Sequence, residues 1–169
     1  MWLNGEAFRN LPHVLQTSYL HTFHNMANSF KEAVENPPEI SGGYRPGLQA
    51  LGANSAKVSL ADNRLTSGSV DIDDQTKDLY HDDNRWDYAI GYNDLTYFVE
   101  VHPAQTSEVD CVLKKLAWLK QWLRTKATGC PEQKRLNDLP KGIPSFIWVQ
   151  SGKGAILAGS KQAKSIAVA

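Results

Sequence analysis

Residues 86–102 read WDYAIGYNDLTYFVEVH, and this stretch decides the fold. Its two parts, 86–92 and 96–102, are rich in aromatic and β-branched residues, and only residues 93–95 separate them. Such a pattern predicts two strands joined by a tight turn. We therefore expect a β-hairpin at the centre of the domain.

Three polar side chains interrupt this apolar hairpin. With a two-residue turn, Asp87 stands directly opposite Glu100, and with a loop two residues longer it stands opposite His102. In either register all three share one face, because side chains alternate along a strand. The small residues Ala89 and Gly91 lie on that face and predict open space beside the carboxylates.

The other face of the hairpin is apolar and aromatic, and we expect it to pack on a helix. Its predicted members are Trp86, Tyr88, Ile90, Tyr92, Leu95, Tyr97, Val99 and Val101. This pattern fixes the register, because a slip of one residue would bury the acidic groups.

Two carboxylates directly opposed on neighbouring strands lie ~4.5–5.5 Å apart at Cβ and repel each other. A bound Mg²⁺ or Mn²⁺ would make their closeness favourable, since hard divalent ions prefer carboxylate oxygens. The structural alternative is a solvated pair neutralised by Arg85.

Periodicity and turn residues predict the remaining elements. Before the hairpin we expect a helix over 11–35, a loop over 36–55 with a short helix near 48–51, strands over 57–60 and 69–73, and a polar loop over 74–84. After the hairpin we expect a helix over 107–126, capped by Thr106 or Ser107, and a buried strand over 144–150. The order of the core is helix-strand-strand-strand-helix-strand. It predicts an α/β fold with a single mixed-sheet domain over 1–169 and a core of about 13–151.

This order, with an acid on one strand and a Glu-x-His triplet on the next, resembles the PD-(D/E)XK nuclease-like superfamily. The resemblance implies a restriction-endonuclease-like fold that uses Mg (or Mn). Asp87 and Glu100 would be the metal ligands, and His102 would stand where the family usually has Lys and would place or activate the attacking water.

The resemblance also implies supporting residues. A glutamate of the first helix, Glu35 or Glu32, would add a metal ligand, and Lys114 or Lys115 of the later helix would assist catalysis. Asp71 and Asp73 lie on the polar face of the strand expected over 69–73, and one of them could be a further ligand. Alternatively, they could form an acidic strand edge that deters pairing.

Charge and composition restrict the choice of partners. Lys plus Arg and Asp plus Glu number 18 each, so no overall field draws the chain to nucleic acid or to a membrane. The charges are segregated, with seven Asp in 71–87 and a basic stretch over 114–135. A signal peptide and an apolar run of membrane-spanning length are both missing from the sequence, so we expect a cytoplasmic location and no membrane partner.

The sequence therefore predicts a metal-dependent nuclease that hydrolyses phosphodiester bonds of DNA or RNA. The alternative is a catalytically inactive nuclease-like protein that binds nucleic acid or a protein partner, and a homodimer is compatible with either. A third interpretation is a zinc hydrolase built from His81, Asp87 and His102.

Overall fold

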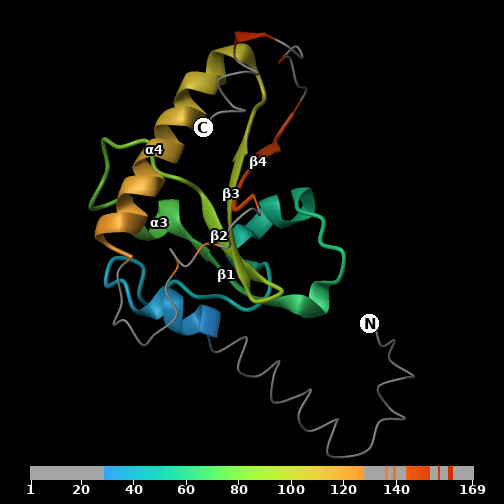
Figure 1. Ribbon diagram of the computed structural model, residues 1–169, viewed down its shortest axis with the longest axis vertical. Coiled ribbons are helices and arrows are strands. Elements are labelled where there is room, and N and C mark those ends of the chain that lie inside the picture. The colour runs from blue at the N-terminus through green and yellow to red at the C-terminus, as the bar shows by residue number, and fades with distance from the viewer. Residues whose placement is uncertain are drawn as a thin grey trace, which may run out of the picture.

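The computed structural model describes residues 29–127 and 144–152, together with Leu136, Leu139, Ile156, Ser160 and Lys161. Residues 29–35 are helical, whereas the rest of the helix expected over 11–35 lies outside the described residues. The elements that follow are η1 (Gln49–Lys57), η2 (Asn63–Leu65), β1 (Thr66–Asp71), α3 (Ile72–Thr76), β2 (Tyr88–Tyr92), β3 (Leu95–His102), η3 (Thr106–Glu108), α4 (Val109–Thr125) and β4 (Phe146–Gln150) (Figure 1). This part of the chain contains no helix with the length and apolarity needed to cross a bilayer.

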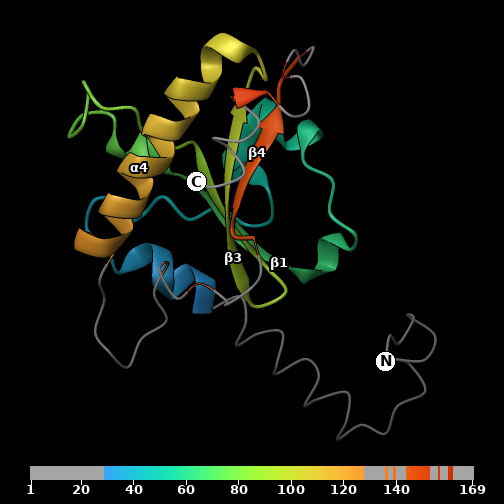
Figure 2. The same ribbon diagram turned by 45° about the horizontal axis from the view of Figure 1, so that its top comes forward.

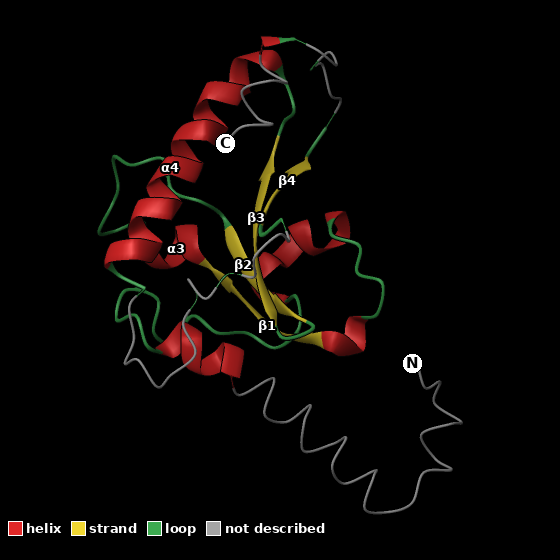
Figure 3. Cartoon of the chain, in the orientation of Figure 1, coloured by secondary structure: helices red, strands yellow, loops and turns green. Residues whose placement is uncertain are grey.

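A single four-stranded sheet organises these elements in the order β1-β2-β3-β4 (Figure 3). The pairs β1–β2 and β2–β3 are antiparallel. The pair β3–β4 is parallel, and α4 lies in the connection between its two strands. The expected mixed-sheet α/β architecture is confirmed.

The hairpin of β2 and β3 has the two-residue turn that the sequence predicts. Tyr92 pairs with Leu95, and the register continues to the pair of Tyr88 and Val99. Asn93 and Asp94 have φ values of 49° and 63°, the left-handed conformation that this kind of turn requires. The residues just beyond the last pair are therefore Asp87 and Glu100.

Both faces of the sheet are covered, as Figures 1 and 2 show with α4 on one side and η1 on the other. The larger core joins β-strand residues to α4 and to the helix at 29–35, through Phe30, Val34, Val70, Ala89, Phe98, Val112, Leu119 and Trp122 among others. The smaller core packs η1 on the opposite face, through Leu51, Tyr88, Ile90 and Val99. The predicted cover of the apolar face is thus provided by the 3-10 helix η1.

The expectation of open space beside the carboxylates is wrong. Ala89 and Phe98 are fully buried in the larger core. A Cβ added at Gly91 would lie 2.5 Å from the Phe30 ring, so this glycine permits close packing of the first helix on the sheet. The small residues bring a helix close to the sheet and leave no free space there.

Several element boundaries also differ from the prediction. Residues 58–60 form no strand. The strand expected over 69–73 is β1, which ends at Asp71 because that side chain accepts the Asp74 N–H and caps α3. The first residues of the loop expected over 74–84 therefore belong to α3. The turn η3 precedes α4, whose N-cap is Glu108, so neither Thr106 nor Ser107 caps that helix.

Two burial predictions also need correction. Trp86 precedes β2, where strict alternation does not apply, and it packs in the larger core with Ala89 rather than beside Tyr88. The strand β4 is only partly buried, with Ile147 37% exposed, because it is the last strand of the described sheet.

Candidate active site

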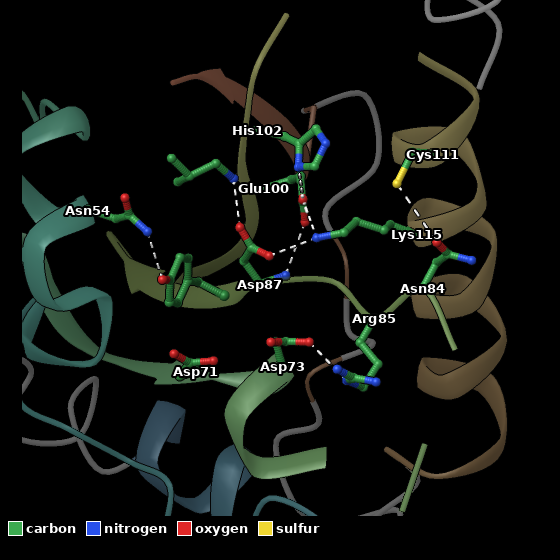
Figure 4. A network of polar contacts seen from close by, with 12 residues as sticks. Asn54, Asp71, Asp73, Asn84, Arg85, Asp87, Glu100, His102, Cys111 and Lys115 are labelled. Carbon is green, nitrogen blue, oxygen red and sulfur yellow. Dashed lines mark hydrogen bonds and ion pairs between the residues drawn. The ribbon is translucent and has the colours of Figure 1, made fainter. Parts of the chain in front are cut away.

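Three charged side chains from three separate segments meet on the α4 side of the sheet (Figure 4). Asp87 directly precedes β2, Glu100 lies on β3, and Lys115 reaches them from α4. The Lys115 Nζ atom lies 2.9 Å from Asp87 Oδ1 and 2.5 Å from Glu100 Oε1. The ammonium therefore bridges the two carboxylates that the hairpin register placed together, and we call these three residues the carboxylate–lysine triad.

The main chain of the hairpin holds one oxygen of each carboxylate. The Asp87 N–H donates to Glu100 Oε2 at 3.1 Å, and the Val101 N–H donates to Asp87 Oδ2 at 3.0 Å. Each carboxylate thus accepts a hydrogen bond from a main-chain N–H at or next to the other acid, and these two bonds orient both side chains. They leave Asp87 Oδ1 and Glu100 Oε1 facing one point, where Lys115 Nζ lies.

The backbone at Asp87 is anchored on its other side by α3. The Asp87 carbonyl accepts the Ile72 N–H at 2.8 Å and the Asp73 N–H at 3.3 Å. These donors belong to the first turn of α3, whose amides lack partners within the helix. The short helix after β1 thus sets the position of Asp87, although Asp87 is not part of a strand.

Contacts of His102 with two glutamates continue the network towards solvent. His102 Nδ1 lies 3.5 Å from Glu100 Oε1, and His102 Nε2 lies 2.9 Å from Glu108 Oε2. The His102 carbonyl accepts the Trp148 Nε1–H at 3.0 Å and the Ser151 N–H at 3.1 Å, which fixes the end of β3. The sequence pattern did not predict this contact between His102 and Glu108.

Burial dominates the electrostatics of the triad. The Glu100 side chain is 0% exposed, and this desolvation raises its pKa to about 8, with a further rise from the charge of Asp87. The contact with Lys115 opposes that rise without cancelling it. Burial lowers the pKa of Lys115, but Glu100 and Asp87 outweigh this effect, and the net pKa lies above its usual value. Lys115 is therefore a cation at neutral pH.

The structure distinguishes between the two lysines that the sequence left as alternatives. Lys114 lies exposed, whereas the Lys115 side chain is 15% exposed and points into the triad. Lys115 follows Val112 by three residues and precedes Leu119 by four, so it lies on the buried stripe of α4. This spacing was a usable signal in the sequence.

Glu35 and Asp71 do not join the triad. The Glu35 carboxylate accepts the Ser41 hydroxyl at 3.1 Å and the Gly42 N–H at 2.8 Å, which closes the turn after the first helix. Asp71 lies close enough to be affected by the charge of Asp87, and burial raises its pKa to about 6. Figure 4 shows Asp71 and Asp73 below Asp87, with Asp73 paired to Arg85 at 2.8 Å. Arg85 therefore does not neutralise the carboxylates as the structural alternative expected.

The donor set at the triad suits a hard divalent ion with two protein ligands. Among the described residues, no group of three or more His, Cys, Asp or Glu side chains is arranged to hold a metal. Asp87 Oδ1 and Glu100 Oε1 nevertheless converge within 2.9 Å of one cation, and Mg²⁺ is commonly bound by one or two carboxylates with water. The zinc interpretation lacks such support, since the exposed His81 pairs with Asp82 at 3.0 Å.

No protein-family model, curated protein or solved structure matches this chain. Any functional conclusion therefore depends on the chemistry of the triad and of its surroundings.

Proposed function

We propose that this protein is a metal-dependent nuclease of the restriction-endonuclease-like class that hydrolyses phosphodiester bonds of DNA or RNA. The observation that carries the proposal is the convergence of Asp87 Oδ1 and Glu100 Oε1 on one cation, with the remaining oxygen of each acid held by the main chain. The order of elements and the mixed sheet support the assignment of class.

Asp87 and Glu100 would hold Mg²⁺ or Mn²⁺, which when bound polarises the phosphate and lowers the pKa of water. Glu35 and Asp71 remain predicted additional ligands, although their present hydrogen bonds serve a turn and a helix cap. The role of the main chain is to keep both carboxylates oriented, so that little rearrangement accompanies binding.

His102 and Lys115 supply the remaining chemistry. Glu108 Oε2 contacts His102 Nε2 at 2.9 Å, and this contact orients the imidazole so that its Nδ1 atom lies next to Glu100. In hydrolysis His102 would accept a proton from the attacking water as the water oxygen bonds to phosphorus. The bond from phosphorus to the leaving oxygen would break, and that oxygen would take a proton from solvent. The Lys115 ammonium stabilises the negative charge that develops on the phosphate.

The exposed side of α4 carries two cations that would attract a polyanionic substrate. Lys114 and Arg124 are exposed on the same helix whose inner side carries Lys115. Lysine and arginine next to a cleavage site attract phosphates and make binding dependent on salt. This local charge offsets the absence of an overall positive charge.

The test is cleavage of labelled single- and double-stranded DNA and RNA in Mg²⁺ or Mn²⁺. Asp87→Asn and Glu100→Gln keep the side-chain shape and are expected to reduce cleavage by at least about a hundredfold, since even residues behind metal ligands contribute 10–100-fold. Asp78→Asn removes an exposed acid from the neighbouring loop and serves as the matched control. Unchanged cleavage by both triad variants would rule the proposal out.

A second candidate is a nuclease-like protein without hydrolytic activity that binds a protein or nucleic acid. The observation that favours it is that the polar groups of the site already pair with one another, since Lys115 contacts both Asp87 and Glu100 and Glu108 contacts His102. Calorimetry that detects no Mn²⁺ binding, together with fluorescence anisotropy that detects nucleic-acid binding without cleavage, would support this candidate over the first.

A further inference from the structure

We infer that Lys115 is an exchangeable internal cation, which leaves the carboxylate pair when a divalent ion binds there and returns when the ion departs. This inference rests on the proposed function, because it concerns the same carboxylates. It assigns Lys115 two positions and makes metal binding a replacement of one cation by another.

The distances require such an exchange. Lys115 Nζ lies 2.9 Å from Asp87 Oδ1 and 2.5 Å from Glu100 Oε1, which are the two oxygens that the main chain leaves available. A Mg²⁺ ion needs the same oxygens at ~2.0–2.1 Å. An ammonium and a divalent cation within ~3 Å of each other would repel strongly in a buried site. The two cations therefore cannot share these oxygens.

The supports of the carboxylates are independent of the lysine. The Asp87 N–H and the Val101 N–H belong to the hairpin, and they hold Glu100 Oε2 and Asp87 Oδ2 without any contribution from α4. Departure of Lys115 thus leaves the pair of acids in place. Its flexible four-carbon stem allows the ammonium to move while the helix stays packed through Val112 and Leu119.

Release of Lys115 when the metal binds would make its ammonium available to the phosphate of the substrate. An ammonium released from the carboxylates is an unpaired cation beside the metal and seeks a new anion. A phosphate at the metal supplies that anion, so the same lysine that closes the site without metal would bind the substrate with metal. The carboxylate–lysine triad is then the resting form of the site.

The test is lysine modification on the unaltered protein. An amine-acetylating reagent is applied with EDTA or with Mg²⁺, and acetylation of each lysine is followed by peptide mass spectrometry. We expect Lys115 to be protected in EDTA and to react at least about tenfold faster in saturating Mg²⁺. A tenfold change lies in the lower part of the range of effects that one bound ligand usually has on another. Lys114, its exposed neighbour on α4, is the internal control and should react equally in both. In Asp87→Asn the effect of Mg²⁺ on Lys115 should disappear.

A second measurement uses Lys115→Met, which keeps the stem and removes the charge. Without metal no cation lies between Asp87 and Glu100 in this variant, so we expect Mn²⁺ to raise its thermal midpoint by several degrees more than that of the unaltered protein. Equal shifts in the two proteins would overturn the exchange.

Failure of the inference and failure of the proposed function are distinguishable. Metal-dependent cleavage with Lys115 equally protected in EDTA and Mg²⁺ overturns the exchange alone. Release of Lys115 by Mg²⁺ without cleavage of any nucleic acid supports the exchange and overturns the nuclease assignment alone. Calorimetry that detects no metal on either the unaltered protein or Lys115→Met overturns the exchange directly, whatever the cleavage assay gives.

Discussion

Burial of Glu100 predicts that the protein loses stability as the pH rises towards 8, and Glu100→Gln tests this. The pKa of Glu100 is 4.5 in an ordinary setting and about 8 in the folded protein. The folded state therefore binds more protons than the unfolded state between these values. Its contribution to stability is complete below pH 4.5 and is lost as the pH rises through 8.

The size of the effect follows from the shift. Each pKa unit corresponds to about 1.4 kcal/mol, so the full shift corresponds to about 5 kcal/mol. Roughly 3–4 kcal/mol of this loss falls between pH 5 and pH 8. No correction for solvent screening is needed because the Glu100 side chain is 0% exposed. A glutamine keeps the shape and one acceptor oxygen but does not titrate.

The assay is urea unfolding at half-unit intervals from pH 5 to pH 8 with EDTA present. The free energy of unfolding of the unaltered protein minus that of Glu100→Gln should fall by roughly 3–4 kcal/mol across this range. Subtraction removes other titrating groups, including Asp71, whose pKa of about 6 adds a smaller loss of the same sign. Glu32→Gln, on the exposed side of the first helix, controls for loss of a glutamate. Curves that stay parallel within about 1 kcal/mol would refute the assignment of a buried, raised-pKa acid.

Three further predictions concern the triad and its cover. Lys115→Met should destabilise the metal-free protein by roughly 3 kcal/mol at pH 8 and by less at pH 5, because one partner of a buried ion pair is removed. In the same unfolding assay, Lys114→Met should change the free energy of unfolding by less than about 0.5 kcal/mol. Apparent affinity for Mn²⁺, measured by calorimetry, should rise by up to about tenfold per pH unit from pH 6 to pH 8, because the metal displaces the Glu100 proton, and an unchanged affinity would contradict this. Gly91→Ala should lower the free energy of unfolding by about 1–3 kcal/mol in thermal or urea unfolding, since its methyl group would meet the Phe30 ring. Gly42→Ala is the control for backbone strain alone, because no atom lies within 4 Å of an added Cβ there but φ is +84°.

The hairpin could be predicted because its signals are local. Asn93-Asp94 sets the two-residue turn and with it the register, which places Asp87 beside Glu100 before any tertiary contact is known. The expectation that a slip of one residue would bury the acidic groups is wrong, because both faces of the sheet are covered and Glu100 is buried in the observed register. The choice of Lys115 over Lys114 was available in principle, since only Lys115 lies in phase with Val112 on the buried stripe of α4.

The packing over the carboxylates could not be predicted from the same signals. Small residues at 89 and 91 fit either an open site or a close helix, and alternation along one strand does not distinguish the two. The answer depends on Phe30 and on α4, which are far from the hairpin in the chain. The contact of Glu108 with His102 was missed for a similar reason, because it depends on how η3 turns the chain into α4.

The carboxylate–lysine triad is difficult to explain by stability alone. Replacing a buried ion pair with apolar residues of similar size is often neutral or stabilising, and the triad borders a core that already contains Phe98, Val112 and Leu119. Glu100 is kept fully buried at a pKa of about 8, which costs stability at neutral pH. The main-chain bonds to both acids also orient oxygens that an apolar core would not need. Strongly shifted acids with a specific charged partner are typical of sites that perform chemistry, so the cost supports a role for the triad in binding a cation and acting on an anion.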